Sequence, residues 1–265
     1  MSLPNIVTRA EWLVARKALL EKEKAVTRQQ DALSEARRNL PMVKIDKDYV
    51  FEGERGPARL IDLFEGRPQL IIYHFMFGPA WEKGCHRCTA MWDESGDGRF
   101  RHLHSRDTTL ALISHAPLKN LNAYKASRGW TFPWYSSYGG DFNYDFHVTV
   151  DESVKPPEYN FSTKAEHEEA GTGYWFEGTR PLEMPGFSCF VQDANSVFHT
   201  YSTYGRGVEV AHPSFHLLDL TALGRQEVWE RPIGRVEHPF PALPFATHRL
   251  PSASIVERIS IQGSM

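Results

Sequence analysis

The order of apolar runs and amphipathic segments along the chain predicts an α/β protein. Residues 70–77 and 108–114 form apolar runs of strand length, which are typical of strands buried on both faces of a sheet. Helical spacing predicts a helix over 117–128. The runs 187–191 and 197–203 flank a turn-forming segment and predict a β-hairpin. Strands that alternate with helices in this way favour an α/β fold.

A long helix is predicted over residues 8–38. Thr8 and Glu11 have the spacing of a capping box at its start, and Pro41 bars a long continuation. Its apolar residues form a patchy stripe, and residues 22–38 are heavily charged. Such a helix either packs at the periphery of the core or contacts a second subunit. The second interpretation predicts a homodimer through the N-terminal helix.

Composition divides the chain into three parts. Residues 1–42 are a helical extension, 43–232 are the main domain, and 233–265 are a proline-containing tail. Four prolines from position 239 onward predict that the tail is poorly ordered. Within the main domain, residues 150–180 are polar and irregular, which indicates an insertion or lid, and a last helix is predicted over 216–223.

Charge and cysteine content exclude several classes of protein. The chain has 265 residues, with 30 Lys and Arg against 33 Asp and Glu, and a formal charge of −3. This near balance argues against nucleic acid or a membrane surface as a partner. No apolar stretch approaches the roughly 18 residues of a membrane helix, and the first residues lack a signal-peptide pattern. Three cysteines do not make a secreted disulfide scaffold, so we expect a cytoplasmic protein.

Two of the cysteines, Cys85 and Cys88, follow the first buried strand and open a predicted helix. A helix N-terminus and nearby cations lower the pKa of a thiol, and Lys83, His86 and Arg87 supply positive charge. Cys85 is expected to be the exposed, attacking thiol, and Cys88 the resolving thiol one turn inward. This pattern predicts a thiol–disulfide oxidoreductase with no cofactor besides its own disulfide, acting on an unknown thiol or disulfide substrate.

Two other interpretations of the pair stay open at this point. Cys85 and Cys88 precede His102 and His104 at an approximate zinc-site spacing, although the two histidines are closer together than in a usual finger. Zinc would be the cofactor of such a site. The cysteines are otherwise ordinary core residues of a non-catalytic interaction module.

Several long strings of residues resemble the DUF899 family of thioredoxin-like proteins. They are Tyr73–Pro79, the cysteine pair, Arg106–Thr109, Trp130–Phe146 and Val197–Gly207. The resemblance extends over roughly residues 5–232. It implies that 43–232 are a thioredoxin-like three-layer sandwich around a central mixed sheet, closer in layout to peroxiredoxins than to minimal thioredoxin. The long N-terminal helix and the 150–180 insertion are additions to this fold.

The resemblance also implies a cis-proline beside the cysteines, at the Met184–Pro185 bond; the alternative is a trans proline at a strand start. Thioredoxin carries Trp directly before its first cysteine, whereas this chain has Gly84 there and Trp81 upstream. The proline–threonine spacing of peroxiredoxins is absent before Cys85. A thiol peroxidase is therefore the second alternative function.

Three further features have structural interpretations. His74 lies inside the first buried strand and is expected to be a hydrogen-bonded core histidine. Cys189 lies in an apolar strand and is expected to be an inert buried thiol. The aromatic residues of 130–146 are expected mainly in the core, with a pocket near the thiols as the alternative.

Overall fold

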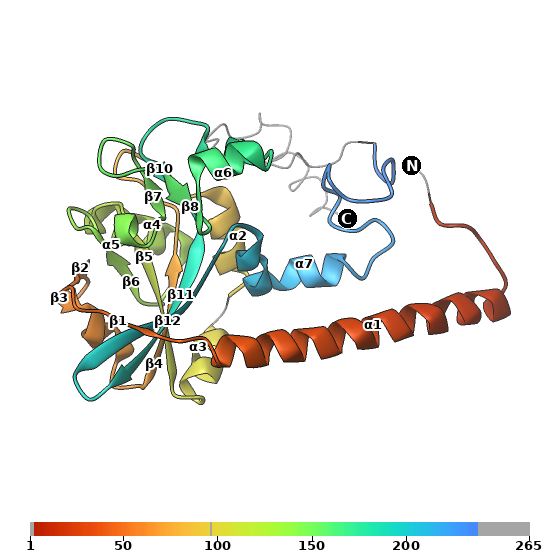
Figure 1. Cartoon of the computed structure of the whole chain (residues 1–265), viewed down its shortest axis with the longest axis horizontal. Helices are drawn as coiled ribbons and strands as arrows, with labels where there is room; N and C mark the ends of the chain where they lie inside the picture. Colours follow the sequence, from red (N-terminus) through yellow and green to blue (C-terminus); the bar gives the residue numbers. More distant parts are fainter. Residues whose placement is uncertain (1–2, 96, 238–265) are drawn as a thin grey trace.

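The computed structural model describes residues 3–95 and 97–237 (Figure 1). In chain order the elements are α1 (Arg9–Arg38), β1 (Val43–Lys44), β2 (Val50–Gly53), β3 (Gly56–Arg59), the 3₁₀ helix η1 (Leu60–Phe64), β4 (Gln69–His74), α2 (His86–Asp93), α3 (Asp97–His104), β5 (Thr108–Ser114), α4 (Leu118–Arg128), β6 (Trp134–Ser136), α5 (Phe142–Asp145), β7 (Thr149–Val150), β8 (Glu158–Tyr159), β9 (Ser162–Thr163), α6 (Lys164–Glu169), η2 (Gly173–Phe176), β10 (Leu182–Glu183), β11 (Gly186–Asp193), β12 (Ser196–Tyr204), η3 (Gly205–Ala211) and α7 (Pro213–Leu218).

The strands form one mixed sheet in the order β1-β12-β11-β4-β5-β6-β2-β3, with two small pairs, β7–β10 and β8–β9, beside it. β4, β5 and β6 are parallel, and β11 is antiparallel to both β4 and β12. Helices α2 and α3 make the crossover between the parallel strands β4 and β5, as parallel strands require. This order and these directions make the fold α/β and thioredoxin-like, as the pattern of runs and the family resemblance respectively led us to expect.

The sheet lies between two apolar cores, because successive residues of a strand point to opposite faces. Leu70 and Ile72 of β4 belong to the core that η1, α5 and the 150–180 segment cover. Tyr73 of the same strand and Leu112 of β5 belong to the opposite core, which α2, α3 and α4 cover. The molecule therefore has three layers, and the cysteine pair belongs to the second core.

The 150–180 segment is more than a lid. It carries β8, β9, α6 and η2 between the two strands of the β7–β10 pair. Tyr159 and Phe176 from this segment are buried in the first core. The Tyr159 and Phe176 rings cover part of the sheet face opposite α2, so the insertion contributes to the core on that face.

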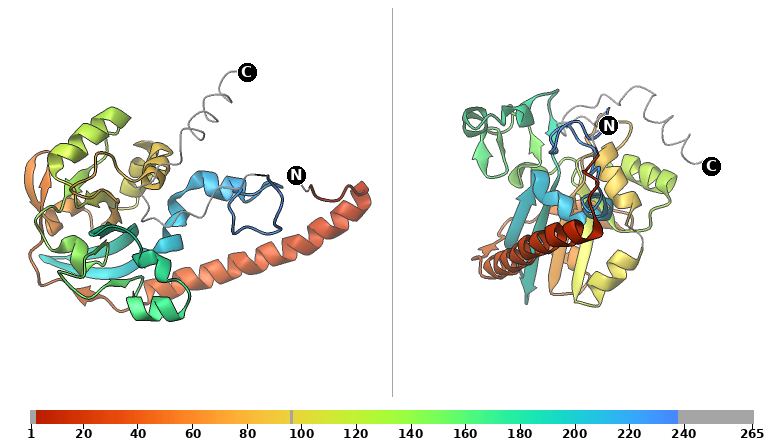
Figure 2. Two further views of the ribbon diagram at one scale, coloured as in Figure 1. Left: turned by 90° about the horizontal axis from the view of Figure 1, so that it is seen from above. Right: turned by 90° about the vertical axis from the view of Figure 1, so that its right-hand side faces the viewer.

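Helix α1 begins with the predicted capping box, in which the Thr8 hydroxyl accepts from the Glu11 amide. None of its residues is buried, and the helix projects away from the sheet (Figures 1 and 2). At its C-terminal end the guanidinium of Arg37 lies over the ring of Tyr201 in β12, 5.3 Å from the centroid. The interpretation of α1 as a helix packed on the core is wrong.

Two element boundaries differ from the prediction. β4 ends at His74, although the apolar run continues to Phe77. The Phe75 amide still donates to the Ile113 carbonyl of β5 at 2.9 Å, and residues 75–77 then stay buried in the second core. The last helix is α7, which begins at Pro213 rather than 216 and ends at Leu218. Proline suits that first turn because it has no amide hydrogen to leave unpaired. The expected disorder of the proline-rich tail concerns residues beyond 237, which lie outside the described residues.

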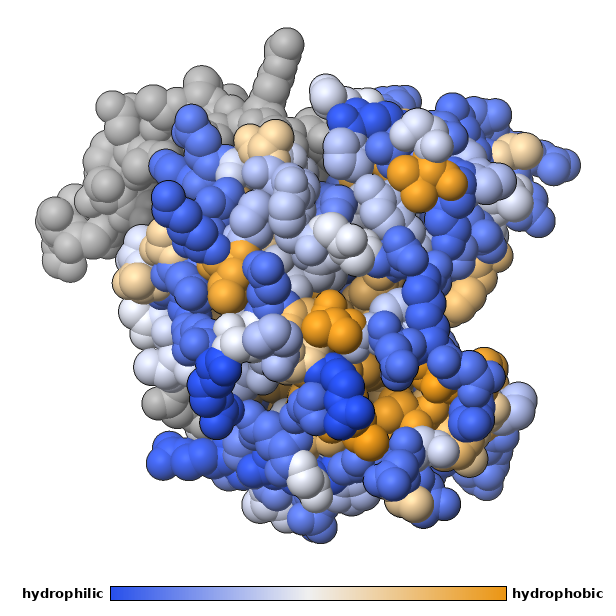
Figure 3. Space-filling view, turned by 90° about the vertical axis from the view of Figure 1, so that its left-hand side faces the viewer, coloured by the Kyte–Doolittle hydropathy of each residue, from blue (hydrophilic) through white to orange (hydrophobic). Residues whose placement is uncertain are grey.

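The face of the molecule drawn in Figure 3 is largely hydrophilic and carries several apolar patches, of which the broadest lies beside an indentation. Among the described residues, no helix has the length and apolar character that crossing a membrane requires.

Candidate active site

The cysteine pair lies where β4 gives way to α2, at the carboxyl end of the parallel strands. Cys85 is the N-cap residue of α2, so the helix opens at the pair, as predicted. The Cys85 amide donates to the carbonyl of Met76 at 2.9 Å, and the Thr89 amide donates to the carbonyl of Cys85 at 2.8 Å. The first bond ties the loop to the end of β4 and the second begins the helix, so Cys85 is held from both sides.

Cys88 lies one turn further along α2 and is 2% exposed. The hydroxyl of Tyr73 in β4 donates to its Sγ at 3.1 Å. Both cysteines are free thiols in this structure. The inner sulfur is thus enclosed by protein and has a hydroxyl donor against it.

The surroundings of the two thiols move their pKa values in opposite directions. The pKa of Cys85 is lowered chiefly by a hydrogen bond from the Cys88 side chain. The backbone amides of Arg87 and Cys88 and the charge of the Arg87 guanidinium lower this pKa further. The pKa of Cys88 is raised, chiefly by burial, which disfavours its thiolate. Cys85 is therefore the thiol that ionises first.

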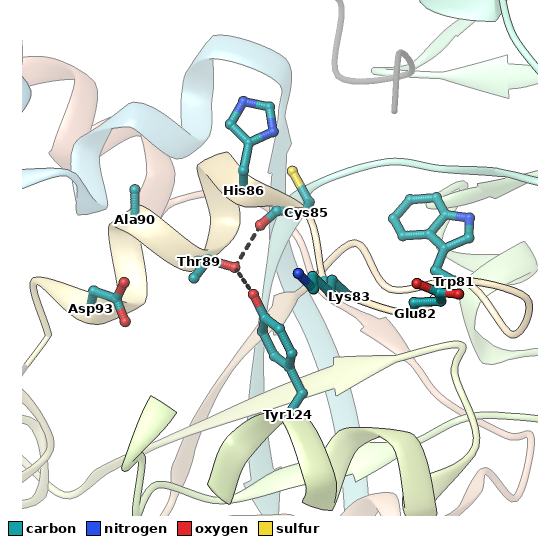
Figure 4. Close-up of a pocket in the computed structure, with 10 residues that line it drawn as sticks. Trp81, Glu82, Lys83, Cys85, His86, Thr89, Ala90, Asp93 and Tyr124 are labelled. Atoms are coloured by element: carbon teal, nitrogen blue, oxygen red, sulfur yellow. Dashed lines mark hydrogen bonds between the residues drawn. The ribbon is translucent and has the colours of Figure 1, made fainter. Parts of the chain in front are cut away.

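Cys85 is 5% exposed, so the expectation of an exposed attacking thiol is wrong. Its surroundings bury it because the loop before it packs tightly: a Cβ at Gly84 would lie 2.5 Å from the Phe75 ring. Cys85 instead lines a cavity of about 600 Å³ (Figure 4). A substrate must therefore enter this cavity to reach the Cys85 sulfur.

Three of the predicted supporting residues, Trp81, Lys83 and His86, line the same cavity as Cys85 (Figure 4). Arg87 points elsewhere, and its Nη1 lies 3.9 Å from the Glu227 carboxylate. Its charge still helps to lower the pKa of Cys85. The sequence therefore located Trp81, Lys83 and His86 beside the first thiol, but not the other charged and aromatic residues of the cavity, which are Glu82, Asp93 and Tyr124.

The predicted cis bond at Met184–Pro185 is wrong, since the cis bonds of the described residues are Arg180–Pro181 and Arg231–Pro232. The chain is held extended on both sides of Pro185. The Met184 amide donates to Val148 at 2.7 Å, and Gly186 pairs with His74 at the start of β11. Pro185 lacks an amide hydrogen, and its carbonyl accepts from the Tyr159 hydroxyl at 3.1 Å. Pro185 is thus the trans proline at a strand start.

The structure does not assemble the alternative zinc site. His102 and His104 lie at the end of α3, where His102 is exposed, whereas Cys88 is buried under α2. Within residues 3–95 and 97–237, no group of three or more His, Cys, Asp or Glu side chains is placed to hold a metal ion. The four residues therefore do not fit a zinc ion in this arrangement.

Sequence reasoning missed three hydroxyls around the pair. The Thr89 hydroxyl donates to the Cys85 carbonyl at 2.8 Å (Figure 4). The Tyr124 hydroxyl lies 2.9 Å from the Thr89 hydroxyl. The third is Tyr73. Successive residues of β4 point to opposite faces of the sheet, so the sequence could have placed Tyr73 on the face opposite Ile72, toward the cysteine pair. The position of Tyr124 beside the pair depends on how α4 packs against α2.

His74 is a hydrogen-bonded core histidine, as predicted: its Nε2 lies 2.8 Å from the Ser188 hydroxyl. Burial lowers its pKa to about 3, so it is neutral. Cys189 is partly buried in β11, and burial raises its pKa to about 11. That value keeps the thiol protonated and unreactive near neutral pH. The aromatic residues of 130–146 lie mainly in the two cores.

A family model described as "Bacterial protein of unknown function (DUF899)" matches residues 1–239. No curated protein matches the chain. The chain is similar to a crystal structure of a Cys-to-Ser mutant of PrxQ from Xylella fastidiosa, with a TM-score of 0.36 and 8% identity over 68% of this chain and 96% of that chain. It is also similar to a solution structure of a candidate protein disulfide isomerase from Bacteroides thetaiotaomicron (TM-score 0.28, 23% identity, 38% of this chain and 64% of that chain). A third similar structure is BsSco, a member of the Sco family of cytochrome c oxidase assembly proteins (TM-score 0.31, 12% identity, 65% of this chain and 94% of that chain).

Proposed function

The chain belongs to the DUF899 family of bacterial proteins, and from the geometry of its cysteine pair we propose that it is a thiol–disulfide oxidoreductase. One observation carries the proposal: the pKa of Cys85 is lowered on the wall of a cavity, while the pKa of Cys88 behind it is raised. A nucleophilic thiol in front and a protonated thiol behind it are what a two-step disulfide exchange needs.

In the first step the Cys85 thiolate attacks one sulfur of a substrate disulfide. A mixed disulfide forms between Cys85 and that sulfur, the substrate S–S bond breaks, and the leaving thiolate takes a proton from water. The Cys88 thiol then passes its proton to the sulfur of the bound substrate half and attacks the Cys85 sulfur. The Cys85–Cys88 disulfide forms and the second substrate half leaves as a thiol, so the substrate gains two electrons and the protein loses two. An external dithiol, or two monothiols, returns the pair to the reduced form.

Tyr73 supports the second step of this scheme. Its hydroxyl is 3.1 Å from the Cys88 sulfur in an interior that gives a thiolate no water. A hydrogen bond to an ionised acceptor is stronger than one to a neutral acceptor. Tyr73 therefore stabilises the Cys88 thiolate at the moment it forms, and it opposes the effect of burial on the pKa of Cys88.

The test is the equilibrium of the pair against a glutathione redox series, read by thiol alkylation and mass spectrometry. We expect a reversible Cys85–Cys88 disulfide with a potential between about −270 and −120 mV, the range of working oxidoreductases. Cys189→Ser is the matched control and is expected to give the same potential. Failure of the disulfide to form at any poise, or alkylation that is blocked until a chelator is added, refutes the proposal.

We also propose that the protein works in a reducing compartment, the cytoplasm. Its three cysteines are free thiols, and one of them is activated for exchange with a dithiol reductant. Alkylation of intact cells followed by mass spectrometry is expected to find Cys85 and Cys88 mainly reduced. A fully oxidised pair in untreated cells contradicts this placement.

A further inference from the structure

The cavity at Cys85 has a size and a wall that indicate what reaches the thiol. It encloses about 600 Å³, within the roughly 300–1,000 Å³ of small-molecule sites. Cys85 is 5% exposed and lies in its wall beside Trp81 and Tyr124. A disulfide in a folded protein joins two chain segments, and both segments would have to fit into the cavity with it. A low-molecular-weight disulfide fits into the cavity by itself.

The wall is formed by packing that leaves the loop little freedom. At one end of the loop, a Cβ at Gly78 would lie 2.9 Å from the Trp81 indole nitrogen. At the other end, the Gly84 backbone lies directly on the buried Phe75 ring. On the opposite side, Tyr124 is tied to α2 through its hydrogen bond with Thr89. The cavity is thus bounded by two fixed aromatic side chains, which suits a small ligand better than a protein surface.

Charged side chains of opposite sign line the cavity next to the thiol. Lys83 and Glu82 come from the loop, and Asp93 comes from the far end of α2 (Figure 4). Asp93 already accepts hydrogen bonds from Arg128 and from the Trp130 indole. Within the part of the chain that the structure describes, neither the Lys83 nor the Glu82 side chain forms a hydrogen bond or an ion pair. One cation and one carboxylate are therefore available to a ligand.

We propose that the substrate of Cys85 is a low-molecular-weight disulfide whose thiol halves carry both a carboxylate and an ammonium group, as in amino acids and short peptides. This inference rests on the proposed function and names its substrate class. Lys83 pairs with the carboxylate and Glu82 with the ammonium group, and Trp81 and Tyr124 flank the sulfur atoms. The Cys85 thiolate forms the mixed disulfide with one half and expels the other as a thiolate, which takes a proton from water.

The experiment measures the rate at which Cys85 forms a mixed disulfide in the Cys88→Ser variant, which traps that product. The probes are oxidised glutathione, hydroxyethyl disulfide and insulin, and each rate is divided by the rate of the same probe with free cysteine. We expect the normalised rate for oxidised glutathione to exceed that for insulin by about tenfold or more. Insulin that reacts as fast as the small disulfides overturns the substrate class and leaves the proposed function intact.

Charge variants test the pairing with the ligand. Lys83→Met and Glu82→Gln are each expected to lower the normalised rate with oxidised glutathione by about threefold, the size of an exposed ion pair. Each variant is expected to lower the rate with neutral hydroxyethyl disulfide by less than it lowers the rate with oxidised glutathione, because the neutral probe has no charge for either residue to pair with. Lys17→Met, on α1, is the matched control. Equal effects on both small disulfides, or none, overturn the role of the charges. Absence of a mixed disulfide with every probe, together with no Cys85–Cys88 disulfide in the redox series, refutes the proposed function itself.

Discussion

At the scale of single residues, the two sulfurs of the pair differ because different groups lie against each of them. Cys85 has the first amides of α2 and the thiol of Cys88, which favour its thiolate. Cys88 has apolar neighbours and one hydroxyl, that of Tyr73. Both residues lie in the first turn of α2, so the difference comes from their places in that turn: Cys85 at the N-cap faces the helix amides, whereas Cys88 faces the core and Tyr73 of β4.

Tyr73→Phe is expected to slow the second step of disulfide exchange and to leave the first unchanged. A hydrogen bond to a charged group contributes roughly 1.5–3 kcal/mol, so resolution by Cys88 is expected to slow by about tenfold or more. Quenched-flow mass spectrometry of the mixed disulfide at Cys85 measures both steps. Tyr49→Phe, whose hydroxyl donates to Asp145, is the matched control. Unchanged resolution in Tyr73→Phe shows that the hydroxyl has no part in the step.

Cys88→Ala is expected to raise the pKa of Cys85, because the hydrogen bond from Cys88 is the largest cause that lowers it. Iodoacetamide reacts with the thiolate, so the alkylation rate rises with pH through the pKa of Cys85, and a lower pKa moves this rise to lower pH. In the variant the rise in the rate of alkylation therefore moves to higher pH. The pH profile of iodoacetamide labelling at Cys85 measures this, and Cys189→Ala is expected to keep the profile of the unchanged protein. Identical profiles for Cys88→Ala and the unchanged protein contradict the prediction.

At the scale of elements, α1 has an apolar stripe that the other described residues, up to 237, leave exposed. Trp12, Leu19, Val26 and Leu33 recur at intervals of seven residues, and their exposed fractions are 44%, 50%, 62% and 46%. A seven-residue apolar repeat is the pattern by which helices pair in coiled coils. The homodimer through α1 stays a prediction, and this repeat indicates which residues would form its interface.

Removal of residues 1–40 is expected to convert a dimer into a monomer, as measured by light scattering. The combined substitution Leu19→Glu and Val26→Glu is expected to do the same without shortening the chain, because it places charges on the apolar stripe. Lys17→Glu alone, on the helix face away from the stripe, serves as the control. A monomer mass for the full chain that truncation does not alter counts against the homodimer.

At the scale of the whole molecule, a buried polar network attaches the small β7–β10 pair to the main sheet. Glu183 of β10 is 2% exposed, and its carboxylate lies 2.9 Å from Nδ1 of His115, which follows β5. The Thr149 hydroxyl of β7 donates to the same carboxylate at 2.7 Å, and the Asn143 amide donates to Thr149 at 3.2 Å. The network therefore connects the insertion to the end of the sheet at which β5 emerges.

Glu183→Ala is expected to lower the free energy of unfolding by about 2–4 kcal/mol, because it leaves two buried polar partners without their acceptor. Urea unfolding measures the change. Glu158→Ala is the matched control, since that carboxylate lies 3.7 Å from His147 on the partly exposed surface. The control is expected to cost less than about 1 kcal/mol. Equal effects of the two substitutions contradict a structural role for the buried network.

The sequence by itself determined the features that depend on neighbouring residues. Apolar runs without polar alternation predicted β4 and β5, and the hydroxyl–carboxylate spacing at Thr8 predicted the start of α1. The position of Cys85 and Cys88 at a helix start likewise follows from a strand, a glycine-containing loop and a helical segment in succession. Each of these signals acts within about one turn or one strand, so the order of residues is enough to read it.

Only the tertiary structure decided how deep the first thiol lies and what surrounds it. The recession of Cys85 depends on Phe75 beneath the loop, and its cavity depends on Tyr124 of α4. The extended chain on either side of Pro185 is held by Val148, before β7, and by His74 of β4. The contacts of Tyr124 with α2 and of Met184 with Val148 join segments that lie far apart in sequence, and Phe75 reaches the loop only because the chain folds back over it. No local pattern of residues encodes such distances.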